Sequence, residues 1–447
     1  MIEKYKVKIG DQSLTIEVEK VGSDDPVITN PPQPSTGFKV GANSFPWVPL
    51  RLFESIGMKW VRCYVASGWI WRPNGLFVQP MFQAETQETH GLDDYLQRAK
   101  EKGINPLLCI HQTPEWFRNT GRGDGNNDFA PIKAGASRTD PASYKEYAEF
   151  LFQVAARYGR VKLPDNVLEV DTTPRWSGDI LNEKKSGLDL LTYLEIWNEP
   201  DKWWKKGTEA YFEPEETAAM MSACYDGHEG KLGGGVGIKQ ADPSMKVIMP
   251  GITDTNLPYM QKMDAWFKTN RKDRVWPCDT LNVHHYANRG NKKDQYPAQW
   301  VDEGACTPVY DSNFPAIRDI VDFAAGMGKK VWQTEFGADK IGPSMMLAKG
   351  IAESNEQFQS KIIIQAVKDY KSAGVDAVFV FNSSDENNGA DGGQFETCGL
   401  WSSEATGYRP FVSANDLRAY LAAPAKDARL PQMLVMKASE FKRPIKK

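Results

Sequence analysis

The segment YLEIWNEP, residues 193–200, is a short run of mostly apolar side chains that ends in an amide, a carboxylate and a proline. Seven further strand-like runs of similar length occur along the chain. They are FKVGANSF (38–45), WVRCYVAS (60–67), NPLLCIHQ (105–112), KVIMPGI (246–252), TLNVHHY (280–286), KVWQTEFG (330–337) and AVFVFNSS (377–384). Nearly continuous apolar runs of this length are typical of parallel strands that are buried on both faces.

Helical patterns lie between these runs. The segment 91–103 places four apolar side chains on one face and ends at Gly103; they are Leu92, Tyr95, Leu96 and Ala99. In the segment 140–159, Asp140 is the expected N-cap and Pro141 the first helical residue. Its apolar stripe consists of Tyr144, Tyr147, Ala148, Leu151 and Phe152. A third pattern, 355–374, precedes the eighth run. Eight strand–helix alternations predict an α/β fold, a (β/α)8 barrel.

The two ends of the chain differ from this repeat. Residues 1–37 contain two alternating segments around a Gly-Asp turn and then the proline-rich TNPPQPSTG, which predicts a short N-terminal β-hairpin extension and a linker. The barrel is expected over 38–424. The tail, 425–447, contains PQMLVMKASEF, which could pair with the hairpin. Within the barrel, the unusually long segment 113–192 is expected to shape a substrate site.

Composition and charge exclude several classes of partner. The chain has 447 residues, a formal net charge of −4 and no basic stripe, which argues against nucleic acid as a partner. It has no run of about 18 apolar residues, so no membrane span is expected. Met1 leads into the charged IEKYKVK rather than a signal peptide. The protein is therefore either cytosolic, or its export signal lies outside this sequence.

Two glutamates end strands of the predicted barrel. Glu199 closes the fourth run and Glu335 closes the seventh. Functional side chains of such barrels lie where the strands end, so both carboxylates should face one cavity. Two facing carboxyl groups are the catalytic groups that cleave a glycosidic bond: one protonates the leaving oxygen, and the other attacks the sugar or directs water.

The motifs WNEP at the end of a fourth strand and TEFG at the end of a seventh resemble clan A of the glycoside hydrolases, which are retaining enzymes built on (β/α)8 TIM barrels. The resemblance covers roughly residues 38–422 and identifies no individual family. It implies that Glu199 is the acid/base and Glu335 the nucleophile, whose carboxyl groups should lie about 5 to 5.5 Å apart. It also implies that Asn198 binds the sugar 2-hydroxyl and that Arg62 holds the nucleophile.

Three more strand-end residues match the clan: His111 on the third strand, and His284 with Tyr286 on the sixth. Period two places the side chains of His284 and Tyr286 on one face and that of His285 on the other. Tyr286 could then donate a hydrogen bond to the nucleophile. A carboxylate beside Arg62 would stay ionised, whereas the pKa of the other carboxyl would be raised by burial and by its neighbour's charge.

One departure from the clan concerns the eighth strand, which commonly ends in a tryptophan that forms the floor of the catalytic subsite. This chain has Asn382 and Ser383 there, and Trp401 in CGLWS could swing in as a replacement. Three further acids near the mouth are interpreted as supporting or solvent-facing groups: Glu195, Asp201 and Glu386.

Tryptophans cluster in the loops SGWIW (67–71), PEWF (114–117) and KWW (202–204). Such clusters usually mark binding surface, so Trp69, Trp116, Trp203 and Trp204 are expected to stack on sugars along the barrel rim. Platforms on several loops favour endo cleavage of a β-glycan by a secreted, periplasmic or cell-surface enzyme.

Alternatives to this function stay open. The chain could be an exo-acting β-glycosidase of the same mechanism, or a sugar-binding barrel without catalysis, although it retains both glutamates. A metal-dependent hydrolase would want His-x-His on an early strand, and the first strand has no histidine. No metal ion or organic cofactor is expected, because two carboxylates and water suffice.

Overall fold

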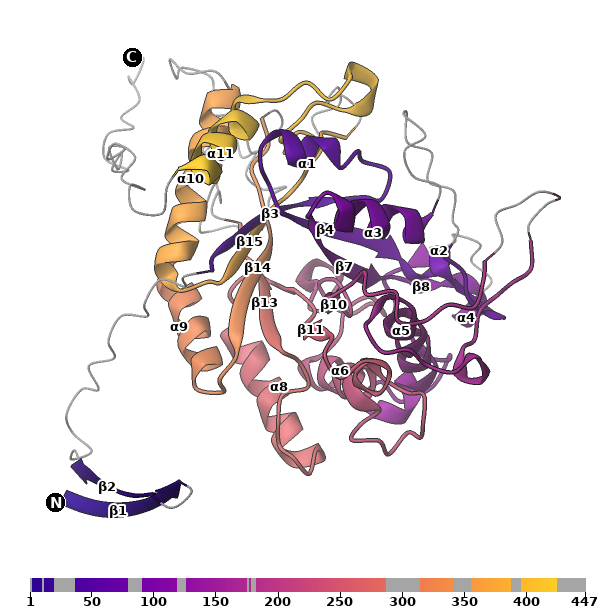
Figure 1. Cartoon of the computed structure of the whole chain (residues 1–447), viewed down its shortest axis with the longest axis vertical. Coiled ribbons are helices and arrows are strands. Elements are labelled where there is room, and N and C mark those ends of the chain that lie inside the picture. The colour runs from indigo at the N-terminus through magenta and orange to yellow at the C-terminus, as the bar shows by residue number, and fades with distance from the viewer. Residues whose placement is uncertain are drawn as a thin grey trace. The chain divides into compact units, whose positions relative to one another are not determined.

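The computed structural model describes residues 2–9, 12–19, 37–78, 91–118, 126–174, 177, 182–286, 314–340, 355–386 and 395–423. Its centre is a closed barrel of eight parallel strand positions (Figure 1). The strands are β3 (Lys39–Ser44), β4 (Trp60–Ala66), β7 (Asn105–His111), β10 (Tyr193–Glu195), β11 (Lys246–Ile248) with its continuation β12 (Ile252–Thr253), β13 (Thr280–His284), β14 (Lys330–Phe336) and β15 (Ala377–Val380). Each position falls within one of the predicted runs except for the last residue of β12, which confirms the predicted fold class.

The barrel closes because β15 pairs with β3 and β11 pairs with β13. Around the circle the order is β3, β4, β7, β10, β11, β13, β14 and β15, which is the order of the chain. All of these pairs are parallel, so the carboxyl ends of the strands meet at one rim. This rim is where barrels of this type carry their functional side chains.

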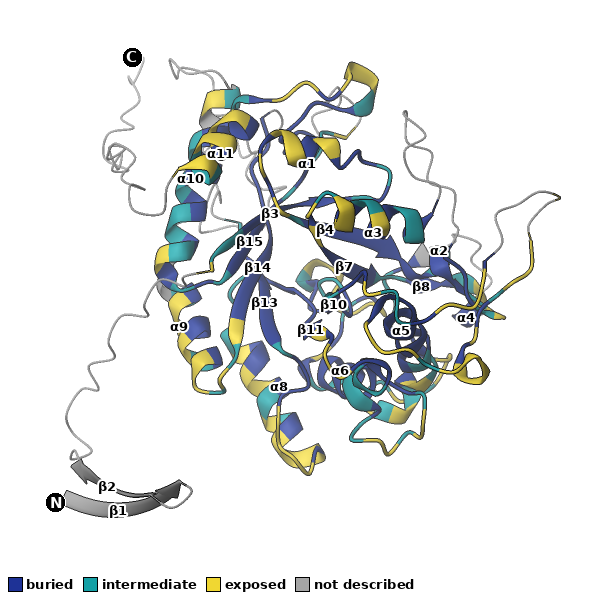
Figure 2. Ribbon diagram, viewed as in Figure 1, coloured by how far each residue is buried: buried dark blue, intermediate teal, exposed yellow. Residues whose placement is uncertain are grey.

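Helices surround the strands, with their buried faces turned inward (Figure 2). They are α1 (Arg51–Ser55), α3 (Leu92–Glu101), α5 (Lys145–Tyr158), α6 (Pro214–Asp226), α8 (Leu257–Asn270), α9 (Phe314–Ala325), α10 (Asn355–Ala373) and α11 (Val412–Ala422), with the short α2 (Ser67–Ile70), α4 (Glu115–Arg118) and α7 (Ile238–Ala241). The four residues predicted to form the apolar face of α3 are the buried ones.

The helix α5 differs from its prediction in two ways. The side chain of Asp140 accepts a hydrogen bond from the backbone of Ala142, but it caps a 3₁₀ turn, Pro141–Tyr144, and α5 itself begins at Lys145. The buried surface of α5 is also wider than the predicted stripe and includes Arg157. The reason is that α6 and α7 pack against this helix in addition to the barrel.

Large side chains fill the lower interior of the barrel, near the amino ends of the strands. Tyr193 and Trp332 have ring centroids 5.0 Å apart, and Trp60 lies edge-on to Trp332 at 5.8 Å. Leu107 and Ile248 are completely buried in the same cluster. Because this end is packed with side chains, a cavity for a ligand is expected only toward the carboxyl ends of the strands.

The N-terminal hairpin forms as predicted. Strands β1 (Ile2–Ile9) and β2 (Gln12–Glu19) pair antiparallel, with Ile9 opposite Gln12. The chain divides into two compact units, residues 1–33 and 34–447. The predicted pairing of the tail 425–447 lies outside the described residues.

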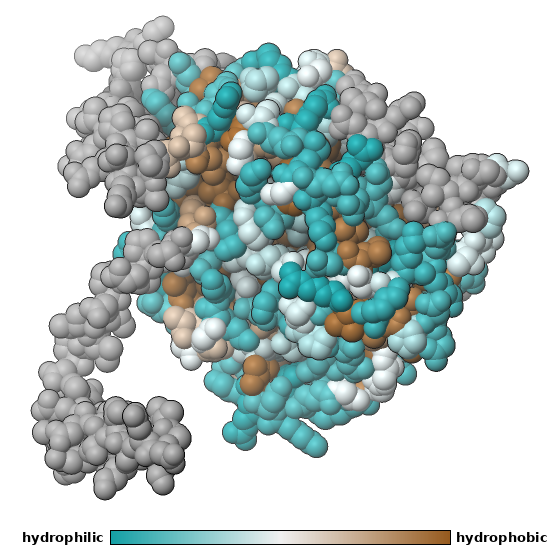
Figure 3. All heavy atoms as spheres, in the orientation of Figure 1, coloured by the Kyte–Doolittle hydropathy of each residue, from teal (hydrophilic) through white to brown (hydrophobic). Residues whose placement is uncertain are grey.

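None of the helices in the described ranges is both long enough and apolar enough to cross a bilayer. One face of the molecule is mainly hydrophilic, with hydrophobic residues in small separate groups (Figure 3).

Candidate active site

A β-bulge in β14 aims Glu335 into the barrel. Gln333 pairs with Val378 and Phe336 with Val380, so β14 uses one residue more than β15 over this stretch. The extra residue lets two consecutive side chains face the interior. Thr334 donates to Asn282 Oδ1 at 2.9 Å, and Glu335 contacts side chains of β4 and of the segment after β13. Bulges beside active sites commonly re-aim a side chain in this way.

The carboxylate of Glu335 is surrounded by donors and is only 8 % exposed. The hydroxyl of Tyr286 donates to Oε1 at 2.8 Å, that of Tyr64 to Oε2 at 2.5 Å, and Nη1 of Arg62 to Oε2 at 3.2 Å. Burial acts to raise the pKa of Glu335, but the charges of His284 and Arg62 and the two tyrosine hydrogen bonds outweigh it and lower the pKa below its usual range. Glu335 is therefore ionised at neutral pH.

Arg62 is completely buried and is held by a second carboxylate. Its Nε and Nη2 donate to the two oxygens of Glu195 at 2.7 and 2.9 Å, and Nη2 also donates to Asn198 Oδ1 at 2.7 Å. Asn282 donates to Oε1 of Glu195 at 3.0 Å. Glu195 is therefore a supporting residue, the first of its two expected roles, and not a solvent-facing one, because period two from Tyr193 places it inside the barrel.

Glu199 follows β10 in a left-handed backbone conformation. Its φ is +46°, and its backbone N–H donates to the carbonyl of Gly251 at 2.9 Å. Non-glycine residues rarely adopt this conformation, and those that do cluster at functional sites. The turn lets Asn198 and Glu199 both reach inward: Asn198 contacts Arg62, and Glu199 contacts His284.

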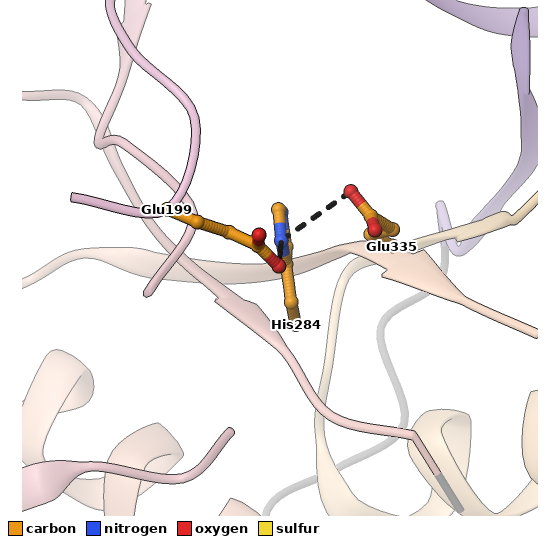
Figure 4. A group of neighbouring side chains, drawn as sticks. All are labelled: Glu199, His284 and Glu335. Carbon is orange, nitrogen blue, oxygen red and sulfur yellow. Dashed lines mark hydrogen bonds and ion pairs between the residues drawn. The ribbon is translucent and has the colours of Figure 1, made fainter. Parts of the chain in front are cut away.

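His284 lies between the two glutamates (Figure 4). Its Nδ1 is 3.0 Å from Glu199 Oε1 and 3.4 Å from Glu335 Oε2, and its Nε2 is 3.0 Å from Thr334 Oγ1. His285 points the other way, to the hydroxyl of Tyr370 on α10, as period two predicts.

Gly251 makes room for this imidazole, and the sequence analysis did not single it out. A Cβ at this position would lie 2.0 Å from His284 Nε2, far inside van der Waals contact. The backbone of Gly251 also donates to Glu195 at 3.2 Å and accepts from Glu199. Gly251 thus helps to position the side chains of His284 and Glu195 and the backbone of Glu199.

The two glutamates and the histidine between them could also hold a metal ion. Glu199, His284 and Glu335 each offer one ligand atom, and these atoms lie within 4.8 Å of one another. Two carboxylate oxygens and an imidazole nitrogen suit several divalent cations. An ion bound there would occupy both carboxylates, so metal binding and carboxylate catalysis are competing uses of the site.

His111 ends β7 beside Tyr64, with ring centroids 5.5 Å apart. Burial and the charge of Lys202 lower the pKa of His111 to about 3, so its imidazole is neutral. Lys202 itself is buried; its Nζ donates to the carbonyl of Asn198 at 3.2 Å and pairs with Asp128 at 3.3 Å. A neutral imidazole at this edge can donate one hydrogen bond to a hydroxyl group and accept one from another.

Asp201 is buried behind the turn that carries Glu199. It accepts hydrogen bonds from the backbone of Thr253 at 2.8 Å and from its hydroxyl at 3.1 Å, which ties this turn to β12. Burial, with a contribution from the charge of Glu199, raises the pKa of Asp201 to about 7. Asp201 is therefore a supporting residue, as expected.

A row of aromatic rings leads away from Glu335 across the ends of β3 and β4. Phe45 lies 5.6 Å from Tyr64 and stacks on Trp47 at 4.6 Å with an interplanar angle of 5°. Trp47 is followed by Trp69 at 5.7 Å. Phe45, Trp47 and Trp69 are all half-buried. The sequence analysis identified only Trp69 in this row, although Phe45 ends the first predicted strand.

The other predicted tryptophans lie in two places. Trp203 and Trp204 are in contact in the loop after β10, and Trp204 is 43 % exposed. Trp116 is also exposed, but it packs edge-on against Trp71, which stacks on Phe150 of the outer helix α5. The expectation that all loop tryptophans form one rim therefore needs correction for Trp116.

Two residues that were predicted to contact the substrate are buried in packing contacts. Trp401 is 1 % exposed, packs against Phe53 of α1, and is held by a backbone hydrogen bond from its N–H to the carbonyl of Ser383. Asn382 is 2 % exposed, and its side chain accepts from the backbone of Ser383. Neither side chain presents a surface to a ligand, because long-range packing covers both.

The aromatic side chain beside the site at the end of the eighth strand is Phe381. Its half-buried ring lies 6.4 Å from Tyr64 and 5.7 Å from Phe395, which in turn lies 5.2 Å from Tyr286. Phe381 thus joins the two tyrosines that bind Glu335. Phe381 was not among the predicted site residues, whereas the next residue, Asn382, was.

Comparison with known proteins supports the fold. Among the similar solved structures is a family 39 glycoside hydrolase from the gut symbiont Bacteroides cellulosilyticus WH2, with a TM-score of 0.53, 13 % identity, and 95 % of this chain and 71 % of that chain covered. Fpglu1 from Fervidobacterium pennivoraus has a TM-score of 0.51, 13 % identity, and 87 % and 96 % coverage. No protein-family model and no curated protein matches the sequence. These similarities confirm the barrel fold and identify no individual family.

Proposed function

We propose that the protein is a retaining glycoside hydrolase in which Glu335 is the nucleophile and Glu199 the acid/base. The observation that carries this proposal is the distance between the two side chains. One carboxylate oxygen of each lies within 4.8 Å of the other. Retaining enzymes hold their carboxyl groups about 5 to 5.5 Å apart, whereas inverting enzymes need about 6.5 to 9.5 Å to admit a water.

In the first step, Glu335 attacks the anomeric carbon while Glu199 transfers its proton to the glycosidic oxygen. The bond between that carbon and oxygen breaks, the leaving sugar departs with the proton, and a glycosyl ester forms on Glu335. In the second step, Glu199 accepts a proton from a water molecule, and the oxygen of that water attacks the same carbon. The ester bond breaks, which restores the carboxylate of Glu335 and the acid form of Glu199.

The surroundings of the two glutamates support this division of roles. Glu335 receives hydrogen bonds from Arg62, Tyr64 and Tyr286, which favour the ionised form that a nucleophile needs. Glu199 has His284 as its partner and is the more exposed of the two side chains, at 14 % against 10 %. Greater exposure suits the residue that must exchange a proton with water.

The substrate that fits best is a β-linked polysaccharide, cleaved within the chain. In this proposal, Asn198 and His111 bind hydroxyl groups of the sugar beside Glu335, and Phe381 stacks on that sugar. The row formed by Phe45, Trp47 and Trp69 extends from Glu335, while Trp203 and Trp204 lie on the loop after β10. These two groups of stacking surfaces, one after β3 and β4 and the other after β10, suit several sugar units, whose binding energy can act at the scissile bond.

A polymer of this kind does not enter cells. An enzyme that cuts it is therefore expected outside the cytosol, either secreted or held in the periplasm or at the cell surface.

The first experiment is a screen of plant and algal β-glycans for new reducing ends, with Glu335→Ala as the inactive control. On a substrate found in this way, azide should rescue Glu335→Ala and yield a glycosyl azide of inverted configuration. Azide rescue of Glu199→Ala should give the retained configuration. If neither variant loses activity, the assignment of both residues is wrong.

A further inference from the structure

We propose that a pocket on the outer side of the barrel, with Trp116 at its edge, is a second glycan-binding site that holds the polymer away from the catalytic glutamates. The pocket has a volume of about 200 Å³. Its walls come from the hairpin of β5 (Trp71–Arg72) and β6 (Gly75–Leu76), from α4, from α5 and from Lys133 and Glu169. The inference rests on the proposed function for the class of ligand, a β-glycan.

Trp116 is a rigid, exposed platform. Its ring is held by a hydrogen bond from Nε1 to the carbonyl of Trp71 at 3.2 Å and lies edge-on to Trp71 at 5.4 Å. Trp71 is buried and stacks on Phe150 with centroids 5.0 Å apart and an interplanar angle of 14°. Trp116 nevertheless stays 39 % exposed. A ring fixed in this way loses little side-chain entropy when a ligand stacks on it.

Charged groups of both signs line the same pocket. Lys133 lies over the ring of Phe117 at 3.9 Å, and three carboxylates face the pocket from Glu146, Glu149 and Glu169. Burial and the neighbouring charges of Glu169 and Glu146 raise the pKa of Glu149, with Lys145 opposing them.

A sugar unit matches this lining. Its hydroxyl groups can donate to carboxylates and accept from an ammonium group, and its C–H face can stack on an indole. A purely cationic ligand would meet Arg72 and Lys133, and a purely anionic ligand would meet the three glutamates. A neutral polyol therefore fits better than either.

The pocket is separate from the candidate active site. Glu199 and Glu335 point into the barrel, whereas Phe150 and Gln153 line the pocket from α5, a helix on the outside of the barrel. Another residue of this helix, Tyr147, reaches the barrel by donating to the carbonyl of Ile196 at 2.9 Å. None of the pocket's lining residues belongs to the proposed catalytic set. A polymer bound here would raise the local concentration of substrate without touching the reacting atoms.

The test measures polymer binding in a catalytically inactive background. Full-length Glu335→Gln, Glu335→Gln/Trp116→Ala and Glu335→Gln/Val275→Ala are run in native gels that contain each soluble β-glycan of the screen. Val275 is 49 % exposed and lies outside the pocket, so it is the matched control. We expect Trp116→Ala to weaken retention on the polymer by about tenfold, the loss of about 1.4 kcal/mol of stacking. The Val275→Ala control should be unchanged.

A second variant and a second readout keep the result decisive. Glu146→Ala, at a half-buried position of α5 that lines the pocket, should also weaken retention, even if Trp116→Ala folds poorly. In the active enzyme, Trp116→Ala should raise KM for the polymer and leave kcat/KM for a short aryl glycoside unchanged. Unchanged retention in both variants would overturn the second site. So would a loss of kcat/KM on the aryl glycoside that equals the loss on the polymer. Trp116-dependent retention without any hydrolysis would instead retain this site and refute the proposed function.

Discussion

Arg62 donates two hydrogen bonds to Glu195, at 2.7 and 2.9 Å, and both side chains are completely buried in the barrel. The same guanidinium donates to Glu335 at 3.2 Å. One buried cation is thus shared by two carboxylates, one of which is the proposed nucleophile. We infer that Glu195 fixes the position of Arg62 and that only part of the positive charge of Arg62 acts on Glu335.

Replacing Glu195 with glutamine should therefore be strongly destabilising. Glutamine has nearly the same shape, but it removes one charge of a buried pair, and breaking such a pair costs about 3 to 5 kcal/mol. Urea unfolding measures the free energy. Glu386→Gln, on an exposed residue, is the control and should change stability by less than about 0.5 kcal/mol. If the two variants are equally stable, the shared-cation interpretation is wrong.

The sequence predicts the barrel well because the relevant signals are local. Eight apolar runs, their spacing and the helix patterns between them are properties of short segments. Glu199 and Glu335 could be selected because each ends such a run. For Glu195 a supporting and a solvent-facing role both stayed open, because the role of a glutamate inside a strand depends on its buried partner, which lies 133 positions away.

The hydrogen bond from Tyr286 should set the acid limb of the pH–activity profile. Together with His284, Arg62 and Tyr64, it keeps the pKa of Glu335 below its usual range, so Glu335 stays ionised as the pH falls. Tyr286→Phe removes one such bond, which raises that pKa and moves the acid limb of kcat/KM to higher pH by about one unit. Tyr211→Phe, a half-buried tyrosine elsewhere, should leave the profile unchanged. A shift to lower pH would contradict the account.

Gly251 should tolerate no side chain. A methyl group there would lie 2.0 Å from His284 Nε2, so the imidazole would have to move away from Glu199. Displacements of about 1 Å near reacting groups can cost about 100-fold in rate, and we expect a loss of at least that size in kcat for Gly251→Ala. Gly234→Ala is the control, because a Cβ at Gly234 meets no atom within 4 Å. Full activity of Gly251→Ala would show that the position of His284 is unimportant.

Long-range packing explains what the sequence did not reveal. The bulge that turns Glu335 inward is a feature of the pairing between β14 and β15, and the residue types in QTEF do not predict it. The burial of Trp401 depends on Ser383 and on Phe53, which is distant in sequence. Phe381 was overlooked because its position beside Tyr64 depends on contacts between different strands.

Removal of metal ions should leave activity unchanged. The proposed reaction uses two carboxylates and water, although the ligand atoms of Glu199, His284 and Glu335 lie close enough to bind a cation. After dialysis against a strong chelator, the rate on a polymeric β-glycan should equal that of the untreated enzyme. Loss of activity that a divalent metal restores would assign these three residues to a metal centre instead.

The stereochemistry of the first product tests the proposed mechanism most directly. Proton NMR follows the anomeric signals while the enzyme cleaves a β-linked oligosaccharide identified in the glycan screen. Because Glu199 and Glu335 are too close to admit a water between them, the β-anomer should form first, and the α-anomer should rise only at the rate of mutarotation. Initial release of the α-anomer would contradict a covalent intermediate on Glu335.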